Sequence, residues 1–215
     1  MKSVLISIQP YWVFLIIAKI MGWNIEKEKT VEVRKSYPKA ENWDKTVKIY
    51  CSKDRRSFSK IPKEYQPFME QFLGNVIGEF VCDCYDSYWF TESDTDIKEY
   101  EDVQLSCVPV KELLEYANGS SLYFWNISDL VIYDTPKPLW NFMKCGALSE
   151  KELDEELCSY CEQTEWGERR CYGTPDGPAM CEGAFCGEAY GLYLDANFAL
   201  KRPPQSWCYV EGEQC

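Results

Sequence analysis

The 215-residue sequence contains no histidine, and this absence limits the chemistry that the chain can perform. Histidine is the side chain that titrates near neutral pH without perturbation, so acid–base catalysis by imidazole is excluded. Metal binding through imidazole is excluded for the same reason. A zinc site in this chain therefore has to use other ligands, and the 12 cysteines are the obvious source.

A long apolar run is also missing. The apolar stretch from Val4 to Trp23 is interrupted by Gln9, Pro10 and Lys19. Its longest unbroken part, Tyr11 to Ala18, is too short to cross a bilayer, which needs roughly 20 apolar residues. No small-residue cleavage site follows this stretch. We therefore expect a cytoplasmic protein with no membrane partner.

Internal repeats and low-complexity linkers are absent as well. The chain is 46% hydrophobic and 15% aromatic, which is enough to build a core and excludes disorder. Its length suits one large domain or two small ones.

The net charge of −12 argues against a general affinity for nucleic acid, but the charges are unevenly distributed. Residues 1–66 carry 14 positive and 7 negative side chains, whereas residues 67–145 carry 4 and 14, and residues 146–215 carry 5 and 14. A basic segment of an acidic protein can still contact phosphate locally, although the long-range field slows the approach of a polyanion.

Five cysteines lie close together near the C-terminus: Cys158, Cys161, Cys171, Cys181 and Cys186. Four thiolates can close a tetrahedral shell around Zn²⁺, and a Cys-x2-Cys pair supplies two of them from one turn. The spacing favours Cys158, Cys161, Cys181 and Cys186 as the ligands of a structural zinc ion, with Cys171 as a possible substitute. A disulfide framework is the alternative, and the reducing cytoplasm favours zinc.

The hydrophobic patterns predict short strands that alternate with short helices. Val4 to Ile8 is a predicted strand, and a helical period follows it up to Gly22. Thr30 to Arg34 alternates like a strand, with Glu32 and Arg34 on one face. Further strands are predicted over residues 45–51, 75–84 and 122–133, a helix over 110–118, a basic loop over 53–63 and a last strand near 199–210. We expect an α+β fold, a mixed β-barrel with flanking helices and a zinc-bound insertion before the last strand.

Several segments in this order resemble an ASCH domain of the PUA-like superfamily. They are Ser7-Ile-Gln-Pro10, Glu28 to Lys35 with its Lys-Thr-x-Glu-x-Arg pattern, Val76 to Phe80, Trp125 to Tyr133 and Leu200 to Trp207. The cysteine-rich insertion is similar to versions in proteins of phages and mobile elements. The resemblance implies a PUA-like barrel over residues 1–148, a zinc insertion over 149–190 and a final strand over 191–215, in a bacterial host cell.

The resemblance also implies a cleft next to the first helix that accepts RNA, a nucleotide or a modified nucleoside. The ligand-binding residues expected there are Ser7, Gln9, Lys29, Glu32, Arg34, Lys201, Arg202, Gln205 and Trp207. Arg34 could hold phosphate or a base edge, Glu32 could accept from an amino group, and Trp207 could stack on a base. A glutamate and an arginine two apart on a strand also occur as a solvated surface pair, and that reading stays open here.

Two other functions remain possible from the sequence. Some ASCH-like proteins are amidohydrolases of acylated nucleosides, and Lys29 matches their catalytic lysine. Their catalytic threonine, however, falls on the position of Glu32, so an enzyme here would have to use Lys29 and Glu32. A mobile-element protein could instead neutralise a host protein or a nucleotide signal, using the acidic surface predicted over residues 86–102 and 150–168. The expected function is a non-enzymatic binding module.

Overall fold

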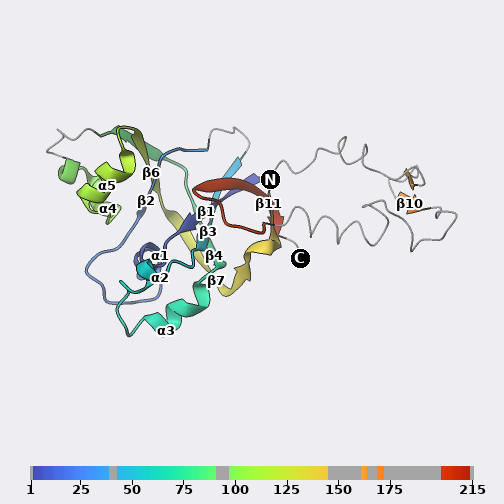
Figure 1. Cartoon of the computed structure of the whole chain (residues 1–215), viewed down its shortest axis with the longest axis horizontal. Helices are drawn as coiled ribbons and strands as arrows, with labels where there is room; N and C mark the ends of the chain where they lie inside the picture. Colours follow the sequence, from blue (N-terminus) through green and yellow to red (C-terminus); the bar gives the residue numbers. More distant parts are fainter. Residues whose placement is uncertain are drawn as a thin grey trace. The chain divides into compact units, whose positions relative to one another are not determined.

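The structure is a computed structural model that describes residues 2–38, 43–90, 97–144, 161–163, 169–171 and 200–213 (Figure 1). Its contacts divide the chain into two compact units. The first comprises Met1–Leu139 with Arg202–Val210, and the second comprises Trp140–Lys201 with Glu211–Cys215. The described part of the first unit contains strands and the helices α1 to α5. The described part of the second unit contains strands and the end of one 3₁₀ turn. The expected α+β class is confirmed.

The first unit is built on a large mixed sheet in which the strands follow the order β7-β4-β3-β1-β11. Strands β1 and β3 run parallel, whereas β4 is antiparallel to both β3 and β7. The bounds are β1 Lys2–Ile8, β3 Trp43–Cys51, β4 Asn75–Val81, β7 Ser128–Pro138 and β11 Trp207–Glu213, of which the last enters the second unit.

A second, three-stranded sheet has the order β2-β6-β5, with both neighbouring pairs antiparallel. Its strands are β2 Val31–Arg34, β6 Ser121–Asn126 and β5 Tyr85–Trp89. Figure 1 shows α4 and α5 beside β2 and β6, and α1 and α2 beside β1 and β3. The helices are α1 Pro10–Ile17, α2 Arg55–Phe58, α3 Gln66–Met69, α4 Glu101–Leu105 and α5 Val110–Ala117, with 3₁₀ turns at Glu70–Phe72 and Ile97–Glu99.

In the second unit the structure describes the 3₁₀ turn that ends at Asn141, strand β8 Phe142–Lys144 and a small hairpin. The hairpin pairs β9 Cys161–Gln163 with β10 Arg169–Cys171 in antiparallel register, so Cys161 lies opposite Cys171.

The main core lies between the large sheet and α1. Alternate residues of β1 (Val4, Ile6 and Ile8) and of β3 (Val47, Ile49 and Cys51) point into it, as the two-residue period of a strand requires. Helix α1 contributes Val13 and Phe14 to Ile17, all buried. Pro10 begins this helix without loss, because the first turn of a helix has no partner for its N–H.

A smaller core lies between the three-stranded sheet and α4 and α5. It contains Val31, Val33, Phe124, Val103 and Leu113. Glu32 lies opposite Trp125 in the ladder, and Trp125 belongs to the main core. Strand β2 is therefore covered on both faces, which explains why all four of its residues are buried.

Most element predictions hold. The helical period expected up to Gly22 ends as a helix at Ile17, however, the basic loop expected over 53–63 contains α2, and the last strand, expected near 199–210, begins at Trp207.

The strand expected over residues 122–133 is two strands, which belong to different sheets. The chain leaves β6 at Ile127, whose N–H donates to the Thr30 carbonyl, and the left-handed backbone of Asp129 (φ 46°) lies just after the break. The polar residues Asn126, Ser128 and Asp129 mark this break within an otherwise apolar segment. Among the described residues no helix is long and apolar enough to cross a membrane.

Gly78 provides a test of how closely β4 and β7 pack. A Cβ atom at this position would overlap the carbonyl oxygen of Val131 and lie 3.0 Å from the Cα atom of Ile132. We expect Gly78→Ala to lower the free energy of unfolding by about 3 kcal/mol or more, since backbone atoms cannot move aside cheaply. Gly22→Ala is the control, because nothing lies within 4 Å of it and only its positive φ of 65° is unfavourable. Its expected cost is about 1 kcal/mol. If urea unfolding shows equal losses of unfolding free energy for the two variants, the close packing of β4 against β7 is wrong.

Candidate functional site

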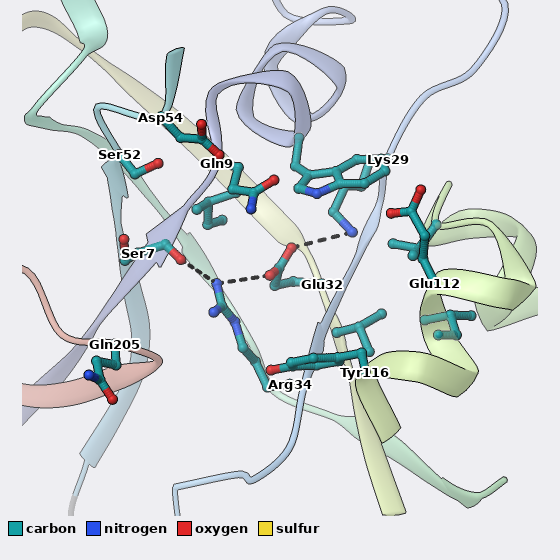
Figure 2. Close-up of a pocket in the computed structure, with 15 residues that line it drawn as sticks. Ser7, Gln9, Lys29, Glu32, Arg34, Ser52, Asp54, Glu112, Tyr116 and Gln205 are labelled. Atoms are coloured by element: carbon teal, nitrogen blue, oxygen red, sulfur yellow. Dashed lines mark hydrogen bonds and ion pairs between the residues drawn. The ribbon is translucent and has the colours of Figure 1, made fainter. Parts of the chain in front are cut away.

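A pocket of about 470 Å³ opens in the first unit between β1, β2 and α5 (Figure 2). It is lined by Ser7, Ile8, Gln9, Trp12, Lys29, Glu32, Val33, Arg34, Ser52, Asp54, Val108, Glu112, Leu113, Tyr116 and Gln205. Gln9, Tyr116 and Gln205 are exposed, whereas Lys29, Glu32 and Arg34 are buried. The pocket therefore has a charged interior and a polar rim.

The alternation of β2 places the charged side chains. Val31 and Val33 pack into the smaller core, so the side chains between and after them, Glu32 and Arg34, point to the other face. Figure 2 shows the Glu32 carboxylate between the Arg34 guanidinium and the Lys29 ammonium. Lys29 precedes the strand, and its side chain extends to the same carboxylate.

Glu32 forms two ion pairs, one through each carboxylate oxygen. Oε1 lies 2.9 Å from Arg34 Nη2, and Oε2 lies 3.3 Å from Lys29 Nζ. The side chains of Lys29, Glu32 and Arg34 are only 1%, 8% and 8% exposed, so all three charges are withdrawn from water. A carboxylate has about four acceptor positions, and two of them remain for a ligand.

Lys29 uses its three N–H donors on three acceptors. Besides Glu32, Nζ donates to the carbonyl oxygens of Val31 at 2.6 Å and Ser106 at 2.9 Å. Burial lowers the pKa of Lys29, and the neighbouring Glu32 carboxylate opposes that effect. An ammonium satisfies all three acceptors, whereas a neutral amine would have only two N–H donors for them. In the ammonium form that these three contacts favour, Lys29 has no lone pair that could attack a substrate.

Arg34 has a buried donor that no described residue satisfies. The two hydrogens of Nη2 serve Glu32 and the carbonyl of Ser7, the latter at 2.8 Å. The Nε–H is buried and has no partner among the described residues. On a guanidinium, Nε–H lies beside one Nη–H and parallel to it, so it lies next to the Glu32 contact. An unpaired donor on a buried charged group costs more than about 1–3 kcal/mol, which a ligand acceptor would remove.

Three other buried side-chain polar atoms of the described residues lack a partner, and they are close to the same pocket. Ser52 lines it. Ser206 follows the lining residue Gln205, and its carbonyl accepts from the N–H of Ser7. Trp125 lies opposite Glu32 in the ladder. Unsatisfied groups are rare in folded proteins, and their concentration around one pocket is typical of a site completed by a ligand or water.

Negative side chains outnumber positive ones among the lining residues. Asp54 and Glu112 join Glu32, against Lys29 and Arg34. Asp54 is occupied in capping α2, where its Oδ1 accepts from the N–H groups of Arg56 and Ser57. Burial raises the pKa of Tyr116 at the rim, so its phenol is a neutral hydrogen-bonding group. The pocket favours a neutral polar ligand over an anion.

Six of the nine expected ligand-binding residues line the pocket: Ser7, Gln9, Lys29, Glu32, Arg34 and Gln205. Lys201 and Arg202 are exposed and do not line it. Trp207 packs against the main core and its indole N–H donates to Ser36 Oγ at 2.9 Å, so it is also outside the lining. Of the four ligand-binding residues expected around the proline turn before β11, only Gln205 lines the pocket.

Sequence reasoning missed Ser52 and the residues of α5, Glu112 and Tyr116. Tyr116 is exposed, unlike Leu113 and Ala117 of the same helix, and nothing local links it to β2. Trp12 of α1 also lines the pocket, with its ring centre 5.6 Å from Lys29 Nζ.

Most residues of the expected zinc site and of the expected acidic surface lie outside the described residues. Cys158, Cys181 and Cys186 lie outside the described residues, as does most of the acidic stretch over 150–168 and part of that over 86–102. Within the described parts of the chain, no three His, Cys, Asp or Glu side chains form a group that could hold a metal ion.

The charge cluster predicts strong energetic coupling between Lys29 and Glu32. We expect Lys29→Met and Glu32→Gln each to lower the free energy of unfolding by about 3–5 kcal/mol, because each leaves a buried charge or its acceptors unpaired. The double variant should lose less than the sum by about 1–3 kcal/mol. Urea unfolding of all four proteins measures this difference.

The control cycle uses Arg55 and Glu70, a bidentate pair that is 65% and 50% exposed. Water screens such a pair, so Arg55→Met and Glu70→Gln should show far smaller losses and little coupling. Additive effects at Lys29 and Glu32 would contradict the buried cluster.

Comparisons with known proteins give limited similarity. No protein-family model matches the chain, and no curated protein is significantly similar in sequence. A crystal structure of ASCH from Zymomonas mobilis is 15% identical with a TM-score of 0.45, covering 97% of this chain and 87% of that one. A Tyr-to-Phe mutant of the same protein gives 14% and 0.47, with 98% and 91% covered. Because these values are low, the function has to be inferred from the pocket itself.

Proposed function

We propose that the chain is a non-enzymatic binding module of the ASCH type, and that its pocket holds a base of RNA or of a modified nucleotide. The observation that carries the proposal is the buried Glu32 carboxylate, held by Lys29 and Arg34 inside a cavity of about 470 Å³. The ion pairs fix the carboxylate, so a ligand meets acceptors that are already oriented.

A base edge complements the free hydrogen-bonding groups. Glu32 offers acceptors and the adjacent Arg34 Nε–H offers a donor. The ligand that fits has a donor beside an acceptor, as in the amide or amidine edge of a nucleobase. Trp12 and Tyr116 supply partly exposed aromatic surface on which such a flat group can pack.

A phosphate group fits the same place poorly. Lys29 has no free donor and both Arg34 Nη2 hydrogens are occupied, so Nε and Nη1 of Arg34 are the cationic donors left in the pocket interior among the described residues. The three carboxylates of the lining would also repel an anion. We therefore place the sugar and phosphate of the ligand toward the rim.

Turnover is the alternative, with Lys29 and Glu32 hydrolysing an acylated nucleoside. Such a reaction needs a nucleophile or an activated water held against a base. Thr30 does not line the pocket, and its N–H and carbonyl bond to Leu105 and Ile127. Both carboxylate oxygens of Glu32 are already engaged, one by Lys29 and one by Arg34. This arrangement favours recognition.

Arg34→Lys and Glu32→Gln test the proposed recognition. Lysine keeps the charge but lacks Nε–H, and glutamine removes the charged acceptor. We expect each to weaken nucleoside binding about 5- to 100-fold, as for loss of one polar or bidentate base contact. Isothermal titration with a panel of plain and modified nucleosides measures the affinities. Glu79→Gln is the control, since Glu79 is also a strand carboxylate paired with a lysine, Lys48, but lies outside the pocket.

Unchanged affinity in the folded Arg34→Lys protein would place the ligand elsewhere. The same panel with acylated nucleosides decides about turnover. Multiple turnover that is lost in Lys29→Ala would establish the amidohydrolase and overturn the non-enzymatic proposal.

We further propose that the cysteine-rich segment binds one structural Zn²⁺. The four favoured ligands are Cys158, Cys161, Cys181 and Cys186. The register of the hairpin supports a role for Cys171 too, because residues directly opposite on antiparallel strands are close neighbours. A shell of four thiolates leaves no open position, so the metal would stabilise the fold and take no part in binding the base.

Metal analysis of protein purified under reducing conditions should find one equivalent of zinc. Double substitution Cys158→Ser/Cys161→Ser should abolish it, whereas Cys84→Ser should not, because Cys84 is an exposed free cysteine between β4 and β5. Chelation should expose the segment from Cys158 to Cys186 to protease and leave nucleoside affinity unchanged. Less than half an equivalent of zinc, with disulfides among these cysteines, would support the disulfide framework instead.

A further inference from the structure

We propose that the free edge of strand β5 binds an extended basic segment of a partner protein, which adds a fourth strand to the three-stranded sheet. No residue of β5 lines the pocket, so this surface is separate from it. The inference therefore goes beyond the proposed function and does not depend on it.

Strand β5 pairs with a neighbour on one side only. It is the last strand in the order β2-β6-β5, and no described strand pairs with its other side. Its five residues pair with β6 in a continuous register, from Tyr85 opposite Trp125 to Trp89 opposite Ser121. In an antiparallel ladder, alternate residues direct both backbone groups to one neighbour, and the residues between them direct both groups to the other.

The hydrogen bonds to β6 show which residues face the free edge. The N–H of Asn126 donates to the Cys84 carbonyl at 3.3 Å, just before β5 begins. Asp86 and Tyr88 are two and four residues further on, so they also direct their backbone groups to β6. The residues that direct both backbone groups away from β6 are Tyr85, Ser87 and Trp89. Each offers one N–H donor and one carbonyl acceptor to an added strand.

The free edge of β5 lacks the usual protection against pairing. Proteins commonly protect such edges with lysine, proline or a β-bulge. Residues 85–89 contain no lysine and no proline, and the register with β6 has no bulge. The one charged residue of the strand is Asp86, which attracts a cationic partner. The edge is therefore open to a strand of opposite charge.

Aromatic side chains cover one face of the sheet at this edge. Tyr85 and Trp89 are 43% and 64% exposed, and the two-residue period places them on the same face. The ring centre of Tyr85 lies 3.8 Å from that of Tyr37 and 5.5 Å from that of Tyr123. These rings form a surface on which apolar side chains of an added strand can pack.

The other face of β5 is acidic. Asp86 is exposed on this face, and Tyr88 donates to Asp102 Oδ2 at 2.8 Å. Burial raises the pKa of Tyr88, and the carboxylates of Asp102 and Asp86 raise it further. In the sequence, residues 83–102 carry eight acidic side chains and one lysine, a net charge of −7. An added strand therefore gains from cations on this face.

The two faces define the chemistry of the partner. In an antiparallel pair, side chains directly opposite each other lie on the same face. Partner residues opposite Tyr85 and Trp89 meet aromatic rings, whereas those opposite Asp86 and Tyr88 meet carboxylates. The matching segment therefore alternates apolar and basic residues. A second copy of β5 does not match, because it brings the same negative charge to the contact.

Isothermal titration with a capped heptapeptide in which lysine and valine alternate tests this surface. Replacing its lysines by glutamates should weaken binding at least about 10-fold, because like charges then meet. N-methylation of the valines should also weaken binding at least about 10-fold, since it removes the N–H groups that face β5. N-methylation of the lysines is the matched control, because their N–H groups point away from β5.

Backbone hydrogen exchange, followed by NMR, locates the bound peptide. A saturating amount of the lysine–valine peptide should slow exchange at the amides of Tyr85, Ser87 and Trp89 at least about 10-fold. The amides of Asp86 and Tyr88 are the internal control, because they already bond to β6 and should change little.

Two variants test the edge from the side of the protein. Ser87→Pro should weaken peptide binding at least about 10-fold, because it removes an outward N–H and leaves the bonds to β6 in place. Asp86→Lys should weaken it about 5-fold or more by replacing attraction with repulsion. Asp134→Lys is the control for charge, since Asp134 is an exposed carboxylate on β7. All three proteins should bind nucleosides like the parent.

Several results would overturn the proposal. These are a lack of peptide binding, equal affinity for the glutamate peptide, and binding that leaves the outward amides unprotected. Parent-like affinity in Asp86→Lys, or in a folded Ser87→Pro protein, would overturn it too. If the same amides become protected without peptide as protein concentration rises, the edge belongs to a second copy instead. Failure of nucleosides to bind would reject the base pocket and leave this surface unaffected.

Discussion

The site depends on one buried carboxylate, Glu32, held between an ammonium and a guanidinium. Two cations and one anion out of water would be costly unless every charge had partners. Here the excess positive charge is spread over carbonyl oxygens of Ser7, Val31 and Ser106, so Lys29 is fully satisfied, whereas the buried Nε–H of Arg34 has no partner among the described residues. In the proposed function, this buried Nε–H beside a carboxylate with spare acceptor positions favours a ligand with both a donor and an acceptor.

Such a cluster needs a strand that is buried on both faces. Strand β2 meets this condition because Val31 and Val33 anchor it in the smaller core while its other face turns to α1 and the large sheet. The segment before it is fixed by backbone bonds, from Lys29 N–H to the Leu15 carbonyl and from Thr30 N–H to the Leu105 carbonyl. The two cores and the backbone bonds to α1 and α4 therefore fix the position of Glu32. The site is rigid and has little conformational entropy to lose on binding.

The sequence predicts the local geometry of this site, but it gives no signal for the contacts between residues far apart in the chain. The period of two in β2 was enough to place Glu32 and Arg34 on one face, opposite to the valines. The contact of Lys29 with Ser106, 77 residues away, depends on how α4 packs and has no local signal. For the same reason Tyr116 was missed and Trp207 was assigned to the ligand, although Trp207 bonds to Ser36, 171 residues away. The segment over 122–133 was likewise expected to be one strand, although its two halves pair in different sheets and Asn126, Ser128 and Asp129 interrupt its apolar residues.

The charge distribution fits a module that reads bases more than it attracts phosphate. A net charge of −12 slows the approach of a polyanion, and three carboxylates line the pocket with only two cations. Non-specific binding, which depends on released counterions, is therefore expected to be weak. In the proposed function, most of the affinity has to come from the desolvated contacts at Glu32 and Arg34 and from packing on Trp12 and Tyr116. A ligand that lacks the matching edge would leave the Arg34 Nε–H unpaired, which favours discrimination between bases.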